Sequence, residues 1–205
     1  MEILAALAAA VAVLLIGAVV WVGRPRGPSL KEVEHLRTPA IVEMGPQRVL
    51  QVSAKGNPNT VAKVAFGLLM KAYFKLGGVP KSGPSFKPPR GRWPVDSGQP
   101  PEEWTGLYAM PVPDTVQEVP PVGEKAGLSV ELLTWEYGTV AQILHLGAYD
   151  QELDTVRILK EFVASKGYEI AGLHEEEYLK GPGFLFRGNP EGYLTLIRYS
   201  VRRAE

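Results

Sequence analysis

The longest apolar run of the chain lies near its amino-terminal end. Ile3 to Val22 contains no charged side chain. At about 1.5 Å of rise per residue, a helix of this length extends about 30 Å, which matches the hydrocarbon thickness of a bilayer. The two residues before it, Met1 and Glu2, lack the basic charge that begins a cleaved signal peptide. The pattern predicts a transmembrane anchor over residues 1–23.

Basic residues follow this apolar run closely. Arg24, Arg26 and Lys31 lie just beyond it, whereas the short segment before it offers only the amino terminus. Under the positive-inside rule, this asymmetry predicts a single-pass membrane protein whose remaining chain lies on the cytoplasmic side. The Arg-Pro and Gly-Pro pairs over residues 24–38 predict a juxtamembrane linker, so that the folded domain spans residues 39–205.

The pattern beyond the linker predicts a strand, a helix and a further strand. Residues 48–54 are apolar-rich and predict the first strand. Asn57 and Pro58 are typical of a helix start, and apolar residues then recur at helical spacing as far as Leu76. Seven prolines between Pro80 and Pro101 predict an irregular stretch, and residues 103–112 return to a strand pattern.

The same order recurs after a proline-rich connector. Residues 139–146 predict a strand, Asp150 caps a helix that ends at Gly167, and residues 171–180 and 192–202 predict two further strands. We therefore predict an α+β fold in which tandem duplicated β-α-β-β units form a pseudo-twofold antiparallel sheet. Repeat one covers residues 39–113 and repeat two covers residues 124–203. Two helices lie on one face, and the other face forms a cleft.

Composition narrows the class of protein. The chain has 205 residues and no cysteine, which excludes disulfides, thiol nucleophiles and thiolate metal sites. The formal net charge is zero, yet residues 48–92 hold nine basic and no acidic residues, while residues 96–191 hold seventeen acidic and six basic ones. The basic first repeat predicts contact with anionic lipid headgroups besides the lipid contact of residues 3–22. Nothing predicts a nucleic-acid partner, because no helix-turn-helix precedes the domain.

Short motifs of the second repeat resemble a known family. They are Gly138 to Ala141, His145 to Tyr149, Lys166 to Glu169, Glu177 to Leu179 and Tyr193 to Val201. In these segments the chain resembles the GyrI-like small-molecule-binding domain, the effector-binding module of bacterial multidrug-sensing activators. The resemblance implies a tandem repeat with a ligand cleft between the halves, lined by aromatic residues and often holding a buried carboxylate.

One position departs from the family pattern. Family members place a glutamate in the last strand, within a Thr-Glu-Ile-Arg type of sequence, where it meets cationic ligands. Here that stretch runs from Thr195 to Arg198, and Leu196 occupies the position of the glutamate. A buried carboxylate without a partner costs several kcal/mol, so its absence indicates a different ligand. We therefore expect a small, largely apolar or amphipathic molecule in the cleft.

The alternation of side chains along the strands selects the ligand site. In the last strand Leu194, Leu196 and Arg198 share one face, and Ile197 and Tyr199 share the face that we expect to pack on a helix. The strand predicted over residues 103–112 then adds apolar side chains to the floor of the cleft. Arg198 is the only charged residue that we expect on this floor. Either Arg198 binds an anionic or carbonyl group of the ligand, or it pairs with a structural carboxylate such as Glu136 or one of residues 175–177. The predicted ligand-binding residues are Leu107, Tyr108, Trp135, Glu177, Tyr178, Leu194, Leu196 and Arg198.

No metal site, cofactor or catalytic residue is predicted. The three histidines lie far apart in the sequence, and His145 shares a strand face with Ala141 and Ile143, which predicts a hydrogen-bonded structural role.

Two alternatives to ligand binding remain open. The resemblance implies, for stand-alone relatives, hydrolysis of cyclopropane-bearing toxins; here Glu177 or Glu136 is then the base, and Tyr178 or Trp135 stabilises the substrate. The other alternative is a membrane-tethered scaffold for a protein partner that the sequence does not name.

Overall fold

The computed structural model describes residues 27–83, 85–94, 98–182 and 188–205. The predicted anchor at residues 3–22 lies outside these residues and stays a prediction. Within the described ranges, no helix is both long and apolar enough to cross a bilayer.

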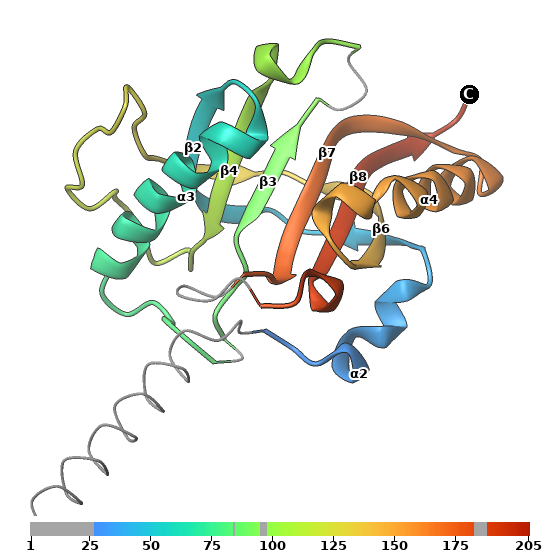
Figure 1. The fold of residues 1–205 in the computed structure, drawn as a ribbon, viewed down its shortest axis with the longest axis horizontal. Helices are drawn as coiled ribbons and strands as arrows, with labels where there is room; N and C mark the ends of the chain where they lie inside the picture. Colours follow the sequence, from blue (N-terminus) through green and yellow to red (C-terminus); the bar gives the residue numbers. More distant parts are fainter. Residues whose placement is uncertain (1–26, 84, 95–97, 183–187) are drawn as a thin grey trace, which may run out of the picture.

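One antiparallel sheet organises the described chain. Its strands are β1 (Ala40–Met44), β2 (Gln47–Lys55), β3 (Arg90–Trp93), β4 (Thr105–Pro111), β5 (Glu131–Trp135), β6 (Gly138–Leu146), β7 (Tyr168–Lys180) and β8 (Leu194–Arg203). They lie in the order β1-β6-β8-β7-β3-β4-β2-β5, so that β7 and β3 meet at the centre (Figure 1).

The helices follow the predicted duplication. The α-helices are α2 (Leu30–Val33), α3 (Pro58–Lys75) and α4 (Leu153–Ser165), and short 3₁₀ turns occupy η1 (Glu34–Arg37), η3 (Pro101–Glu103), η4 (Tyr149–Gln151) and η5 (Pro190–Gly192). The unit β2-α3-β3-β4 and the unit β6-α4-β7-β8 have the same order, and their strands are arranged symmetrically about the β7–β3 junction. The predicted α+β architecture with an antiparallel sheet is confirmed.

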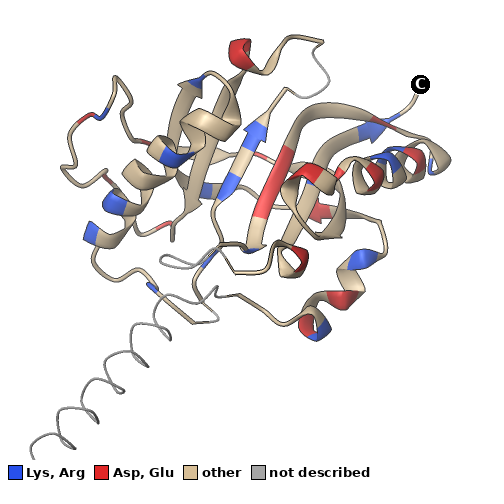
Figure 2. Cartoon of the chain, viewed as in Figure 1, with Lys and Arg blue, Asp and Glu red and all other residues tan. Residues whose placement is uncertain are grey.

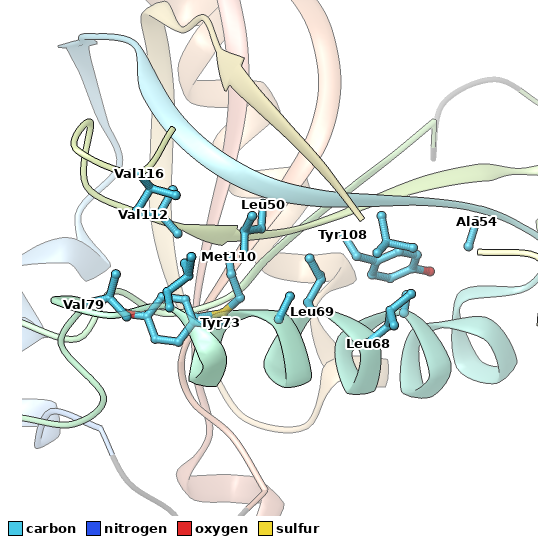
Figure 3. Close-up of a cluster of buried hydrophobic side chains, with 14 of the residues drawn as sticks. Leu50, Ala54, Leu68, Leu69, Tyr73, Val79, Tyr108, Met110, Val112 and Val116 are labelled. Atoms are coloured by element: carbon cyan, nitrogen blue, oxygen red, sulfur yellow. The ribbon is translucent and has the colours of Figure 1, made fainter. Parts of the chain in front are cut away.

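Each long helix covers its own half of one sheet face (Figure 1). Asn57 accepts a hydrogen bond from the amide of Asn59 and Pro58 occupies the first turn, which explains where α3 begins. Figure 3 shows the core under α3, where Leu69 and Tyr73 pack against Leu50 and Met110. Under α4, the core includes Val156, Leu159, Ile143, Ile197, Tyr199 and Val201. Ile197 and Tyr199 thus lie on the helix-packing face, as predicted, and Val201 joins them.

The segment before the sheet differs from the predicted linker. Residues 30–37 form α2 and η1, and Leu30, Val33 and Leu36 pack against Leu194 and Leu196 on the face opposite α4. The folded part therefore includes residues that we assigned to the linker. Their apolar positions recur at helical spacing, but the run is too short to stand out among the charges and prolines around it.

The proline-rich stretch also contains a strand that the sequence pattern did not predict. Arg90 to Trp93 form β3, which pairs with β4 on one side and β7 on the other. Four residues are too few to show alternation, and the prolines at 88, 89 and 94 flank them closely. The edge strands β1 and β5, five residues each, were likewise not predicted.

Candidate functional site

Four adjacent titratable residues at the centre of the sheet are buried. His174, Glu175, Glu176 and Glu177 follow one another in β7 and are 2–6% exposed. Because successive side chains of a strand point to opposite faces, 174 and 176 lie on the helix-bearing face, and 175 and 177 on the other. Figure 2 shows this acidic stretch beside the basic residues of β3. Charged residues are rarely this buried unless they are paired or functional.

On the face without α3 and α4, the carboxylates pair with arginines. Arg92 Nε donates to Glu175 Oε2 at 2.6 Å, and Arg198 Nη1 lies 3.1 Å from Glu175 Oε1 and 2.6 Å from Glu177 Oε2. Arg90 Nη2 lies 3.4 Å from Glu177 Oε2. Arg198 thus pairs with two of the structural carboxylates that the sequence offered, Glu175 and Glu177.

We call the ion-paired side chains of Arg90, Arg92, Arg198, Glu175 and Glu177 the ionic layer. This layer interrupts the apolar floor that the sequence predicted for the cleft. Leu107 clusters with Ala109 and Trp135, whereas Leu194 and Leu196 form a separate cluster under α2 and η1. The expectation that Arg198 is the only charge on this face is wrong. The reason is β3, which enters between β4 and β7 and brings Arg90 and Arg92 into the floor.

On the helix-bearing face, three acid–base groups converge. Glu152, at the amino-terminal end of α4, has its Oε1 3.7 Å from His174 Nε2, which lies 3.1 Å from Glu176 Oε1. His174 Nδ1 is 2.9 Å from the Tyr199 hydroxyl, so the protein orients the ring from its other side. We call Glu152, His174 and Glu176 the acid–histidine cluster. Its members come from the start of α4 and the middle of β7.

The electrostatic field around this cluster is negative. Burial, the charge of Glu176 and a hydrogen bond with it raise the pKa of Glu152 from its ordinary 4.5 to about 8. Burial together with the charge of Glu176 also raises the pKa of Tyr108 to about 12 and holds those of Tyr149 and Tyr178 above their ordinary value. At neutral pH, Glu152 is thus mainly protonated. Perturbed groups gathered in this way are typical of functional sites.

Aromatic rings surround the cluster. Tyr178 lies edge-on to Phe66 of α3 and to Tyr149, with ring centroids 5.7 and 5.5 Å apart, and Tyr193 continues the row beyond Tyr149. Trp93 lies 5.9 Å from His174, centroid to centroid. Phe66 and Tyr178 are partly exposed and Tyr149 is 37% exposed, so the row extends from the surface to the buried carboxylates.

Three buried polar atoms of the helix-bearing face have no hydrogen-bond partner among the described residues. They are the Tyr108 hydroxyl, Glu152 Oε2 and Thr195 Oγ1. A buried polar atom that bonds to nothing costs about 1–3 kcal/mol, so each calls for a water molecule or a ligand. The first two belong to residues whose pKa responds to Glu176.

The structure divides the predicted ligand-binding residues between the two faces. Tyr108 and Tyr178 lie on the helix-bearing face with the acid–histidine cluster. Leu107, Trp135, Glu177, Leu194, Leu196 and Arg198 lie on the other face. Their roles toward a ligand stay predictions.

The residues that sequence reasoning missed are Glu152, His174 and Glu176. The sequence did contain a signal for His174 and Glu176, because four consecutive titratable residues lie inside a predicted strand. Alternation along such a strand places two titratable side chains on each face of the sheet. His145, in contrast, behaves as predicted: its ring nitrogens lie 2.9 Å from Thr155 Oγ1 and 3.0 Å from the Ala148 carbonyl oxygen.

The acid–histidine cluster is also the part of the described chain that is suited to hold a metal ion. One ligand atom from each of Glu152, His174 and Glu176 lies within 4.8 Å of the others. Histidine nitrogen and carboxylate oxygen are ligands that Zn²⁺ accepts. A metal ion would have to displace the proton that Glu152 holds at neutral pH.

The raised pKa of Glu152 makes stability depend on pH. Between pH 4.5 and about 8 the folded state keeps a proton that the unfolded chain has lost, so the unfolding free energy falls as pH rises, by at most about 1.4 kcal/mol per unit. Glu152→Gln carries no such proton. We expect this variant to unfold like the wild type at pH 5 and to be more stable by about 2–4 kcal/mol at pH 8. Urea unfolding followed by tryptophan fluorescence measures the difference.

Glu161→Gln, an exposed change on the same helix, is the matched control and is expected to show no pH-dependent gain. A constant difference between Glu152→Gln and the wild type from pH 5 to 9 would contradict the raised pKa.

Comparison with known proteins adds a fold likeness. No protein-family model matches the chain, and neither does any curated protein. Among solved structures, an uncharacterized conserved protein from Listeria innocua has 22% identity and a TM-score of 0.67, covering 84% of this chain and 98% of that one. A hydrolase from Listeria innocua has 21% identity and a TM-score of 0.62, covering 85% and 99%.

A third similar structure is the C-terminal domain of EcmrR. It has 14% identity and a TM-score of 0.58, and the match covers 82% of this chain and 98% of that one. At these identities the likeness concerns the fold alone. It agrees with the predicted α+β fold.

Proposed function

We propose that this chain binds a small amphipathic molecule at the acid–histidine cluster, between α3 and α4. Glu176 carries the proposal: a 4% exposed carboxylate at the centre of the sheet, close to Glu152 and His174 but to no lysine or arginine among the described residues within 4 Å. The sequence predicted a cleft on the opposite sheet face, where Arg90, Arg92 and Arg198 neutralise the carboxylates.

The chemistry of the cluster favours a ligand with a positively charged or basic group. Glu152 is protonated at neutral pH because its carboxyl is buried and because a second negative charge beside Glu176 is unfavourable. A cationic group would supply the missing counter-charge and release that proton. Tyr178, Tyr149 and Phe66 offer aromatic faces, which attract cations and bury apolar surface. The family glutamate that Leu196 replaces would thus have a functional counterpart in β7.

The membrane anchor belongs to the same proposal. Residues 3–22 would hold the site at the cytoplasmic surface of a bilayer, where amphipathic molecules concentrate. The basic residues of the first repeat favour the same arrangement, since each lysine near an anionic leaflet contributes about 1 kcal/mol.

A second candidate function is hydrolysis, which the carboxyl pair favours specifically. Burial and the neighbouring Glu176 keep Glu152 protonated at neutral pH, so Glu152 can donate a proton to the leaving oxygen of a strained electrophile while Glu176 activates a water molecule. One of the similar structures is named a hydrolase. The roles fall to Glu176 and Glu152 here, rather than to the predicted bases Glu177 and Glu136.

A pair of probes of equal shape and opposite charge tests the binding proposal. Tetraphenylphosphonium and tetraphenylborate both present four phenyl rings, so only the sign of their charge differs. In thermal melting of the full-length chain in non-ionic detergent, we expect the cation at 100 times its Kd to stabilise by about 2.7 kcal/mol, which is about 5–10 °C. The borate is expected to have no such effect. Equal shifts for both ions, or a shift for the borate alone, would overturn the proposal.

A further inference from the structure

A pocket opens on the face of the sheet opposite the acid–histidine cluster. It has a volume of about 130 Å³ and lies over β7 and β8, between Arg92 of β3 and Val140 of β6. Arg198 and Glu175 form its polar side, and Leu173 is among its apolar lining. Its floor is the ionic layer described above, so the pocket is independent of the proposed ligand site.

The ionic layer under this pocket holds more positive than negative charge. Its cations are Arg90, Arg92 and Arg198, and among the described residues the only carboxylates within 4 Å of their guanidinium groups are those of Glu175 and Glu177. One positive charge is therefore in excess. Arg90 is 5% exposed and the Arg198 side chain 8% exposed, so water neutralises this excess poorly.

Both arginines that line the pocket are held in place from their inner side. Arg198 donates through Nε to Gln142 and through Nη1 to Glu175, and Arg92 donates through Nε to Glu175. The Arg92 guanidinium also lies 3.9 Å from the centre of the Trp135 ring and 4.6 Å from that of Tyr137. Stacking of this kind fixes the guanidinium plane. Among the described residues, no bond uses Arg198 Nη2 or the two terminal nitrogens of Arg92, which remain as donors for a ligand.

We propose that this pocket binds a small monocarboxylate. The single excess charge matches a monoanion, and the planar edges of fixed guanidinium groups match a planar carboxylate. A water molecule takes about 30 Å³, so a pocket of about 130 Å³ accommodates a carboxylate with a short alkyl group. Val140 and Leu173 provide apolar surface for that group.

Butyrate is the probe for this site. The full-length chain is melted in 50 mM sodium butyrate and in 50 mM sodium chloride, with sodium phosphate at equal ionic strength as a third arm. For a Kd of about 1 mM, butyrate is expected to raise the melting temperature by about 5 °C relative to chloride. Arg198→Gln is expected to remove this rise. It also removes the excess charge, so the variant itself should fold.

Two further variants separate binding from a general salt effect. Ser200→Leu fills the pocket without changing its charge and should also abolish the butyrate effect, whereas Arg202→Gln, an exposed arginine of the same strand, should keep it in full. An equal rise in Ser200→Leu and the wild type, or no rise beyond chloride, would overturn the proposal. A rise with phosphate but not butyrate would equally refute a carboxylate site.

Discussion

Replacing Glu175 by glutamine is expected to lower the free energy of unfolding by about 3–5 kcal/mol, the usual cost of removing one partner from a buried charge network. Glu175 is 3% exposed and accepts from Arg92, from Arg198 and, at 3.2 Å, from the Tyr137 hydroxyl. Without its charge, three guanidinium groups, two of them buried, face Glu177 alone. Urea unfolding of the full-length chain in mild detergent, at pH 7, measures the loss.

The double variant Arg92→Gln with Glu175→Gln tests the cause of this loss. It restores the charge balance of the wild-type layer, so we expect it to recover about 0.5–3 kcal/mol relative to the sum of the single changes. Glu169→Gln on the same strand is the matched control, because its ion pair with Arg202 is exposed and contributes less than about 1 kcal/mol. A Glu175→Gln variant as stable as this control would refute the structural role of the layer.

Glu176→Gln is expected to weaken binding of tetraphenylphosphonium about 10- to 100-fold. The change keeps the shape of the side chain and removes the charge that the proposed ligand neutralises, which corresponds to about 1.4–2.7 kcal/mol. Stability should not fall, because the variant also relieves the repulsion that raises the pKa of Glu152. Titration of the full-length chain with the cation, followed by tryptophan fluorescence, measures the Kd, and Glu169→Gln serves again as the control.

The same variant separates binding from hydrolysis. The wild type and Glu176→Gln are incubated with p-nitrostyrene oxide, whose ring opens with one water molecule to give a diol. Turnover by the wild type that disappears in Glu176→Gln would support hydrolysis, whereas no turnover above buffer, together with weakened cation binding, would leave the binding function. Unchanged binding and unchanged turnover in Glu176→Gln would place the function away from β7.

The two faces of β7 have opposite electrostatic character. On one face Glu175 and Glu177 are outnumbered by arginines, and on the other Glu176 and Glu152 lack a cationic partner among the described residues within 4 Å, apart from His174 when it is protonated. Alternation along a single strand separates these environments by the thickness of the sheet. Two adjacent glutamates can therefore be expected to respond differently to substitution, one in stability and the other in binding.

Local sequence patterns were sufficient to predict the long helices and the last strand. The apolar spacing and the Asn57-Pro58 start predicted α3, and a comparable stripe predicted α4. The recurrence of that order predicted the duplicated unit, and alternation in the last strand predicted that Ile197 and Tyr199 would face a helix. These features depend on neighbours within a few residues along the chain, which a sequence displays directly.

The site depended on contacts between distant segments. Gly91, in a four-residue strand among prolines, pairs with Glu176, and Glu152 reaches His174 from the start of another element. Whether a glutamate in β7 meets an arginine or a second carboxylate follows from strand order and register, which long-range pairing sets and local spacing does not encode. The sequence therefore showed that β7 carries charge, and the assembled sheet assigned each charge to its partner.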